Sequence, residues 1–163
     1  MKNALVIEQL KKNSFTISVA ESCTGGLLSA ALTSIPGSSE CFGYGAITYS
    51  NQAKHETLGV PWEILQEFGA VSYQTAFWMA KCVRKIAQSH LGVSITGIAG
   101  PAGGSERKPV GLVFMALAKE GFCVAQKYYF QGDREEIRRL TVSRALDLII
   151  QYGVVNDENF YRT

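Results

Sequence analysis

Ser22, Cys23 and Thr24 stand together between an apolar run and the pair Gly25-Gly26. The apolar run predicts a buried strand, and the residues after Gly26 predict a helix. Backbone N–H groups without an intrahelical partner point outward where such a helix begins, so this junction suits a nucleophile or an anion. Two interpretations follow. Ser22 is a nucleophile whose oxyanion binds the N–H groups of Cys23 or Thr24, or Ser22 or Thr24 simply caps the helix.

A serine nucleophile needs a base, and Lys54 is the best candidate. The chain has two histidines; His90 is predicted at a helix C-terminus, where the helix dipole and solvent account for it, and His55 is predicted on the surface. A lysine can act as a base when burial or nearby cations lower its pKa, although most lysines on helical turns are solvated. Tyr49 could orient Lys54 or relay a proton, or be a packed aromatic residue with its hydroxyl in water.

Cys23 is a second possible nucleophile, since a helix N-terminus lowers the pKa of a thiol. No histidine partner is predicted for it, which favours a small packed residue. The four cysteines form no CxxC pair and show no zinc-like spacing with the histidines. They are predicted to be reduced and mostly buried, and no metal site is predicted.

A glycine-rich loop follows a second short apolar run. It contains Gly97, Gly100, Gly103 and Gly104 but lacks the Gly-Lys-Ser/Thr ending of a P-loop and the spacing of a dinucleotide fingerprint. Its backbone N–H groups could cradle one phosphate or carboxylate, or the segment could be only a hairpin-like loop.

Three arginines gather near the start of the last predicted helix, at Arg134, Arg138 and Arg139. Most such clusters form a solvated face. Arg134 could instead reach a ligand phosphate as a bidentate donor.

Periodicity and turn residues predict the elements that position these groups. The last predicted helix begins at an Asp133 cap and carries a Glu135–Arg139 ion pair, and Gly92 ends the helix before the 97–104 loop. Helices are predicted at 3–13, 27–32, 51–58, 62–68, 73–90 and 133–152, and strands at 15–20, 41–50, 93–96, 110–118 and 122–130.

This order predicts a three-layer α/β/α domain with a mixed, partly parallel sheet that includes a late antiparallel hairpin. Both glycine-rich turns would then lie at the carboxyl ends of parallel strands, where ligands bind in open α/β sheets. We expect one domain over residues 1–163, with a frayed tail from about residue 154.

The composition narrows the function classes. With 163 residues, 47% of them hydrophobic, and a formal net charge of +2, the chain is suited to burying a core and is not favoured as a nucleic-acid binder. It shows no signal-peptide run and no apolar stretch of membrane-spanning length. A cytoplasmic protein without a membrane partner is predicted.

Several short motifs, in order over residues about 15 to 150, resemble those of the CinA C-terminal domain family, the nicotinamide-nucleotide amidohydrolases. One departure is Ala102, where the family often has glycine or a polar residue. The matching stretches are Ala20-Glu21-Ser22-Cys23-Thr24-Gly25-Gly26, Tyr49-Ser50-Asn51 with Lys54, Gly69-Ala70-Val71-Ser72, Gly97-Ile98-Ala99-Gly100-Pro101 with Gly103-Gly104, Lys108-Pro109-Val110-Gly111 and Gly132-Asp133-Arg134.

The resemblance implies hydrolysis of the carboxamide of nicotinamide mononucleotide to nicotinic acid mononucleotide and ammonia. It implies that Ser22 is the nucleophile, Lys54 its base and Tyr49 an assisting group, with no cofactor. The substrate-binding residues expected from the resemblance and from the loops are Cys23, Thr24, Gly25, Gly26, Asn51, Gly97, Gly100, Gly103, Gly104 and Arg134.

The resemblance also implies a stand-alone deamidase form that assembles as a homodimer or larger homo-oligomer. The expected partner is a small nucleotide substrate, without nucleic acid. The alternative function is a catalytically weak nucleotide-binding or competence-associated accessory protein of the same fold. A nucleic-acid accessory factor would bind with steep salt dependence, and the near-neutral charge argues against it.

Overall fold

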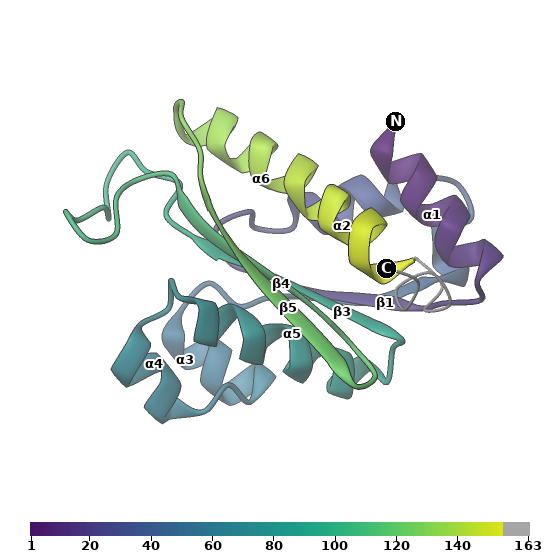
Figure 1. The fold of residues 1–163 in the computed structure, drawn as a ribbon, viewed down its shortest axis with the longest axis horizontal. Helices are drawn as coiled ribbons and strands as arrows, with labels where there is room; N and C mark the ends of the chain where they lie inside the picture. Colours follow the sequence, from purple (N-terminus) through teal and green to yellow (C-terminus); the bar gives the residue numbers. More distant parts are fainter. Residues whose placement is uncertain (155–163) are drawn as a thin grey trace, which may run out of the picture.

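The computed structural model describes residues 1–154, which form a five-stranded mixed sheet between two layers of helices (Figure 1). The strand order is β2-β1-β3-β4-β5. Strand β1 (Ile17–Glu21) pairs in parallel with β2 (Phe42–Ile47) and with β3 (Leu91–Gly97). Strands β4 (Leu112–Lys119) and β5 (Phe122–Tyr129) add two antiparallel pairs. The predicted fold class and the late hairpin are confirmed.

Helices cover both faces of this sheet, as Figure 1 shows. One layer contains α1 (Lys2–Lys12), α2 (Leu27–Thr33) and α6 (Arg134–Leu148), and the other contains α3 (Asn51–Ala53), α4 (Trp62–Phe68) and α5 (Tyr73–Ala87). Three short turns complete the pattern: the 3-10 turn η1 (Ser38–Glu40) and the π-helical turns η2 (Lys54–Leu58) and η3 (Ile149–Gly153).

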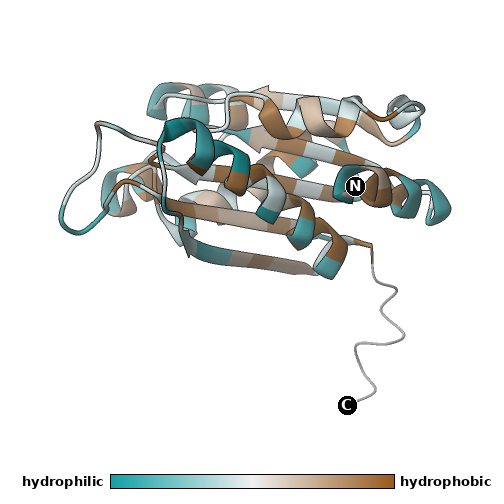
Figure 2. Cartoon of the chain, turned by 90° about the horizontal axis from the view of Figure 1, so that it is seen from above, coloured by the Kyte–Doolittle hydropathy of each residue, from teal (hydrophilic) through white to brown (hydrophobic). Residues whose placement is uncertain are grey.

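Successive side chains of the central strands point to opposite faces of the sheet, so they pack into different hydrophobic clusters. Val19 of β1 packs with residues of α1, α2 and α6, whereas Ala20 packs with Met79 and Val83 of α5. Because both faces are covered, β1, β3 and β4 are buried along nearly their whole length, including polar residues such as Ser18 and Ser94. Figure 2 shows the result, with hydrophilic residues gathered on the helices and loops around a largely hydrophobic sheet.

The end of α5 differs from the prediction. The helix ends at Ala87 rather than His90, because Gln88 takes a left-handed conformation with φ of 51°. Gly92 does not end the helix; it lies inside β3, where a Cβ atom would collide with the Ala80 carbonyl oxygen of α5. Glycine here lets the helix approach the strand closely. His90 Nδ1 accepts a hydrogen bond from the Thr16 N–H, so its role is to join two strand starts.

Other boundaries moved for local reasons. The strand predicted to reach Ser50 ends at Ile47, because the Ser50 side chain caps α3 by accepting from the Ala53 N–H. The Asp133 cap of α6 is confirmed, since its side chain accepts from the Glu136 N–H. On this helix Arg139 pairs with Glu136, at 2.7 Å, rather than with Glu135 as predicted.

The predicted frayed tail falls mostly outside the described residues, which end at Val154. Val154 itself is buried against the core under α6. Within residues 1–154, no helix combines the length and the apolar character needed to cross a membrane.

Candidate active site

Ser22 lies at the carboxyl ends of the three parallel strands. Its backbone N–H donates to the Ile95 carbonyl of β3 at 3.0 Å, and the Thr48 N–H after β2 donates to the Glu21 carbonyl at 2.9 Å. These two bonds fix the residue between its neighbouring strands. The Ser22 side chain is nearly buried, with 7% of the residue exposed.

Lys54 lies at the start of η2, after β2 and α3, and its side chain reaches Ser22. Its Nζ lies 3.0 Å from Ser22 Oγ and donates to the Thr48 carbonyl at 2.7 Å. The lysine is only 1% exposed, and burial lowers the pKa of its amine from 10.5 to about 8. The structure therefore brings together the predicted nucleophile and base. The local reason is the Ser50 cap, which starts α3 and carries the chain into η2.

Cys23 is a poor nucleophile in this fold. It is buried, and burial raises the pKa of its thiol to about 12. The helix effect expected on this thiol is absent, because α2 begins only at Leu27 after the turn through Gly25 and Gly26. These two glycines have φ of 57° and 100°, conformations that side chains disfavour. Glycine at both positions allows the chain to form this turn between β1 and α2.

Glu21 is a site residue that the sequence analysis missed. Its fully buried carboxylate accepts hydrogen bonds from the Thr24 hydroxyl and from the start of α2. The helix donors are the N–H groups of Gly26, Leu28 and Ser29 and the hydroxyl of Ser29, at 2.8 to 3.1 Å. The signal was an acidic residue between the predicted strand and the predicted helix.

This carboxylate corrects the capping interpretation of the junction. Neither Ser22 nor Thr24 caps α2, because Glu21 does so, and the helix-start N–H groups are already occupied. The N–H groups of Cys23 and Thr24 lie in the turn before the helix. Among the described residues, neither of them donates to an oxygen atom.

Arg138 of α6 is a second missed residue. Its Nε donates to the Cys23 carbonyl at 3.1 Å and its Nη2 to the Thr24 carbonyl at 3.0 Å. The basic cluster on α6 is therefore not uniform, because the adjacent Arg139 pairs with Glu136 on the exposed side of the helix. Spacing alone could not distinguish these two arginines.

Arg134 and Tyr49 also meet, although they are 85 residues apart in the chain. Arg134 Nη2 donates to the Tyr49 hydroxyl at 3.0 Å, and Nη1 donates to the Gly100 carbonyl at 2.7 Å. Tyr49 is 59% exposed, and its hydroxyl bonds to Arg134 rather than to Lys54. The predicted Tyr49–Lys54 contact is thus absent from the described hydrogen bonds, and Asn51 lies exposed at the start of α3.

The 97–104 loop extends the β3–β4 hairpin. The Gly111 N–H donates to the Ile98 carbonyl at 2.7 Å, and the Ser105 N–H donates to the Lys108 carbonyl at 2.8 Å. Three of its four predicted binding glycines lie where a Cβ atom would crowd another strand or loop: Gly97 against Val113, and Gly100 and Gly104 against Val110. Gly103 is free of such crowding but has φ of 88°. The hairpin-like interpretation explains these glycines without a ligand.

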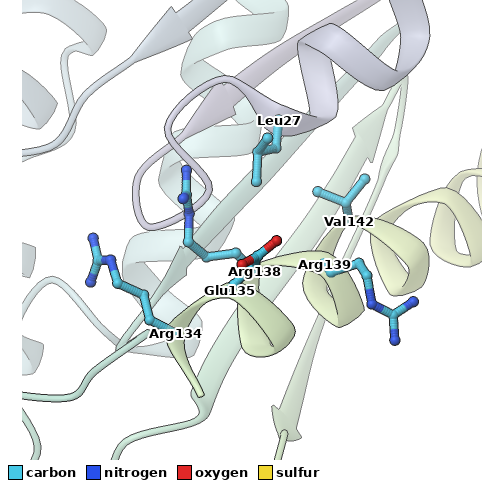
Figure 3. Close-up of a pocket in the computed structure, with 6 residues that line it drawn as sticks. All are labelled: Leu27, Arg134, Glu135, Arg138, Arg139 and Val142. Atoms are coloured by element: carbon cyan, nitrogen blue, oxygen red, sulfur yellow. The ribbon is translucent and has the colours of Figure 1, made fainter. Parts of the chain in front are cut away.

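A pocket of about 570 Å³ lies beside the turn at residues 22–26, between the starts of α2 and α6 (Figure 3). Figure 3 shows Arg138 reaching from α6 toward the loop before α2, while Arg139 points away from it. The pocket is lined by Leu27, Arg134, Glu135, Arg138, Arg139 and Val142.

A larger groove of about 1140 Å³ surrounds the C-terminal half of α5 and the β4–β5 turn, at the opposite end of β3 from Ser22. Neither of these two pockets is lined by Ser22 or Lys54. In residues 1–154, no group of three or more His, Cys, Asp or Glu side chains is placed to hold a metal ion.

Comparison with known proteins places this geometry in a family. The model of the CinA C-terminal domain matches residues 2–152. A putative competence-damage inducible protein of Acetivibrio thermocellus is 50% identical over 145 residues, which are 89% of this chain and 35% of that protein. A CinA-like protein of Geotalea uraniireducens is also 50% identical over 145 residues, 89% of this chain and 34% of its own length. The chain spans about a third of the length of these curated relatives.

Solved structures agree with the fold. The competence/damage inducible protein CihA from Agrobacterium tumefaciens is 43% identical, has a TM-score of 0.90 and is matched over 92% of both chains. A competence-damaged protein (CinA) superfamily protein from Escherichia coli is 32% identical with a TM-score of 0.89, over 92% of this chain and 87% of that one. The chain therefore belongs to the CinA C-terminal domain family.

Proposed function

We propose that this chain hydrolyses the carboxamide of nicotinamide mononucleotide, giving nicotinic acid mononucleotide and ammonia. The observation that carries the proposal is the contact of Lys54 Nζ with Ser22 Oγ at 3.0 Å, within a buried site that lowers the pKa of the lysine to about 8. A base with a pKa near the working pH transfers protons most effectively. The substrate class comes from the family resemblance.

The first half of the reaction forms an acyl-enzyme. Neutral Lys54 accepts the Ser22 hydroxyl proton while Ser22 Oγ bonds to the carboxamide carbon, and the carbonyl oxygen becomes an oxyanion. The Lys54 ammonium then donates its proton to the departing nitrogen, the C–N bond breaks, and ammonia leaves. Throughout, the Thr48 carbonyl keeps the amine oriented toward Ser22.

The second half consumes one water. Lys54 accepts a proton from that water, the resulting hydroxide attacks the nicotinoyl ester carbon, and the C–Oγ bond breaks as the proton returns to Ser22. The donors that we assign to the oxyanion are the turn N–H groups of Cys23 and Thr24. Of these two residues, Cys23 is 5% exposed and Thr24 is fully buried.

Arg134 is the proposed contact for the substrate phosphate. It is exposed, it carries a permanent charge, and it already bridges the Tyr49 hydroxyl and the 97–104 loop at the edge of the site. Tyr49 accordingly belongs with phosphate or ribose binding in our proposal, rather than with proton transfer.

The test is ammonia release from nicotinamide mononucleotide by the purified chain. Ser22→Ala should abolish release while leaving the circular dichroism spectrum unchanged, and the exposed Ser39→Ala serves as the matched control. A wild-type chain that releases no ammonia, or a Ser22→Ala chain that retains activity, sinks the proposal. Tight nucleotide binding without any product would instead favour the accessory-protein alternative.

A further inference from the structure

Arg138 holds the segment that follows the nucleophile from its outer side. Both of its contacts are to backbone carbonyls of consecutive residues, Cys23 and Thr24, at 3.1 and 3.0 Å. A guanidinium bonded to two carbonyls fixes direction as well as distance, because its donors form a rigid planar fork. Arg138 thus connects α6 to a turn 114 residues earlier in the chain.

The inner side of the same turn is held by Glu21, whose carboxylate accepts from the Thr24 hydroxyl at 2.6 Å and from the Gly26 N–H at 3.1 Å. The turn therefore lies between a buried anion and a cation. One further bond, from the Gly25 N–H to the Ser22 carbonyl at 3.0 Å, closes it on the nucleophile itself.

The carbonyl contacts also set the direction of the turn N–H groups. In a trans peptide the C=O and the following N–H point in opposite directions. The peptide that carries the Cys23 carbonyl also carries the Thr24 N–H, so the Arg138 bond turns this N–H away from α6. The Gly25 bond to the Ser22 carbonyl orients the Cys23 N–H in the same manner.

We infer that Arg138 is a positioning residue for the Ser22 nucleophile: by holding the Cys23 and Thr24 carbonyls, it keeps Ser22 Oγ and the turn N–H groups in reactive orientation. This inference rests on the proposed function for its catalytic consequence. Arg138 contacts backbone rather than substrate, so it acts on the turnover rate and not on substrate affinity. Small misplacements of a reacting group can cost about 100-fold in rate.

The kinetic test compares Arg138→Ala with Arg139→Ala, its neighbour on the same helix. We expect kcat for nicotinamide mononucleotide to fall about 10- to 100-fold in Arg138→Ala, with KM changed by no more than about threefold, because only orientation is lost. Arg139→Ala should keep both constants. Wild-type kcat in Arg138→Ala would overturn the inference. If that variant fails to fold, Arg138→Lys replaces it, since lysine keeps the charge but not the two-point fork.

Chemical rescue separates positioning from general destabilisation. Arg138 lines the pocket of about 570 Å³ in Figure 3, so its truncation leaves a space open to that pocket. Added guanidinium or ethylguanidinium should restore kcat of Arg138→Ala several-fold while leaving wild type and Arg139→Ala unchanged. An absence of rescue, together with a lowered melting temperature, would reduce Arg138 to a structural residue.

A second measurement does not depend on turnover. Cys23 is buried in the held turn, so alkylation by iodoacetamide, located by peptide mass spectrometry, reports whether the turn opens. We expect Cys23 to react at least about 10-fold faster in Arg138→Ala than in wild type or Arg139→Ala, since local opening governs access. If wild type releases no ammonia, the proposed function fails, and this rate alone decides on Arg138. Equal rates would then overturn the inference.

Discussion

Two glycine-rich segments follow neighbouring parallel strands, and they behave differently. In the turn after β1, residues 22–24 are buried, and the turn is held by the Glu21 carboxylate and the Arg138 guanidinium. In the 97–104 loop after β3, residues 101–104 are exposed, and Ile98 exchanges backbone hydrogen bonds with Gly111 and Leu112 at the start of β4. Among the hydrogen bonds of residues 1–154, its one contact toward the site is the Gly100 carbonyl, which accepts from Arg134.

The difference shows what glycine means in each place. In the turn after β1, positive φ values at Gly25 and Gly26 aim the chain from the strand into α2 and leave Ser22 facing Lys54. In the loop, Gly97, Gly100 and Gly104 mainly remove Cβ atoms that would strike Val110 or Val113. Glycine content alone therefore does not distinguish a turn held by polar side chains from a loop that packs closely against a strand.

The largest effect should come from Lys54→Met. This variant tests whether the turn after β1, rather than the 97–104 loop, carries the chemistry. We expect ammonia release to fall at least about 1000-fold, because the base is lost. Stability at pH 7 should rise by about 1–3 kcal/mol, because a buried ammonium is replaced by an apolar side chain. Urea unfolding measures the second effect, with the exposed Lys12→Met as control. Full activity in Lys54→Met would refute the base assignment.

Removing the Arg134 contacts that join the 97–104 loop to Tyr49 should have the next largest effect. Arg134→Gln breaks charged bonds to Tyr49 and Gly100, and in our proposal it also loses the phosphate contact. We expect KM for nicotinamide mononucleotide to rise about 10- to 100-fold with a smaller change in kcat, as charge-assisted hydrogen bonds contribute about 1.5–3 kcal/mol. Steady-state kinetics measure this change in KM, with Arg139→Gln as the control. An unchanged KM would show that Arg134 and the loop it contacts take no part in substrate binding.

The pH dependence should sharpen the assignment of Lys54. Neutral Lys54 is the active form in the proposed mechanism, so kcat/KM should rise with pH through an apparent pKa near 8 and then level off. At pH 7 it should be about one tenth of the plateau value.

The same pKa has a stability consequence whose sign can be checked. The folded pKa lies below the 10.5 of the unfolded chain, so the folded chain binds fewer protons between about pH 8 and 10.5, and stability rises with pH there. Below pH 8 the full penalty of the buried ammonium is present. The stability advantage of Lys54→Met should therefore be larger at pH 7 than at pH 10. An advantage independent of pH would contradict the lowered pKa.

The smallest effects come from a pair of glycine variants that compares the two segments directly. Gly26→Ala should cost about 2 kcal/mol of unfolding free energy and lower kcat, because its φ of 100° is strained and its Cβ would press on Ile47. Gly103→Ala should cost about 1 kcal/mol and leave kcat within about twofold, since its nearest neighbour is Ile98 at 3.9 Å. A larger kcat loss in Gly103→Ala would restore a binding role to the loop.

Local patterns predicted more of the fold than of the site. The helix Trp62–Phe68 and the caps Ser72 and Asp133 could be found from sequence, because they depend on neighbours a few residues away. The end of α5 could not, because a left-handed Gln88 and the packing of Gly92 against Ala80 depend on the sheet. The Glu136–Arg139 pair was misassigned by one residue, since both spacings are compatible with a helix.

By itself the sequence determined the layer order, the mixed sheet and the strand-to-turn junction that carries Ser22, because apolar periodicity and glycine placement act locally. Only the tertiary structure decided which groups meet at that junction. Lys54 lies 32 residues from Ser22 in the chain and Arg138 lies 115 residues from Cys23, yet each is within hydrogen-bond reach. The depressed pKa of Lys54 arises from burial by the completed fold. Burial and contact across the sheet are properties of the packed layers, which no single stretch of sequence contains.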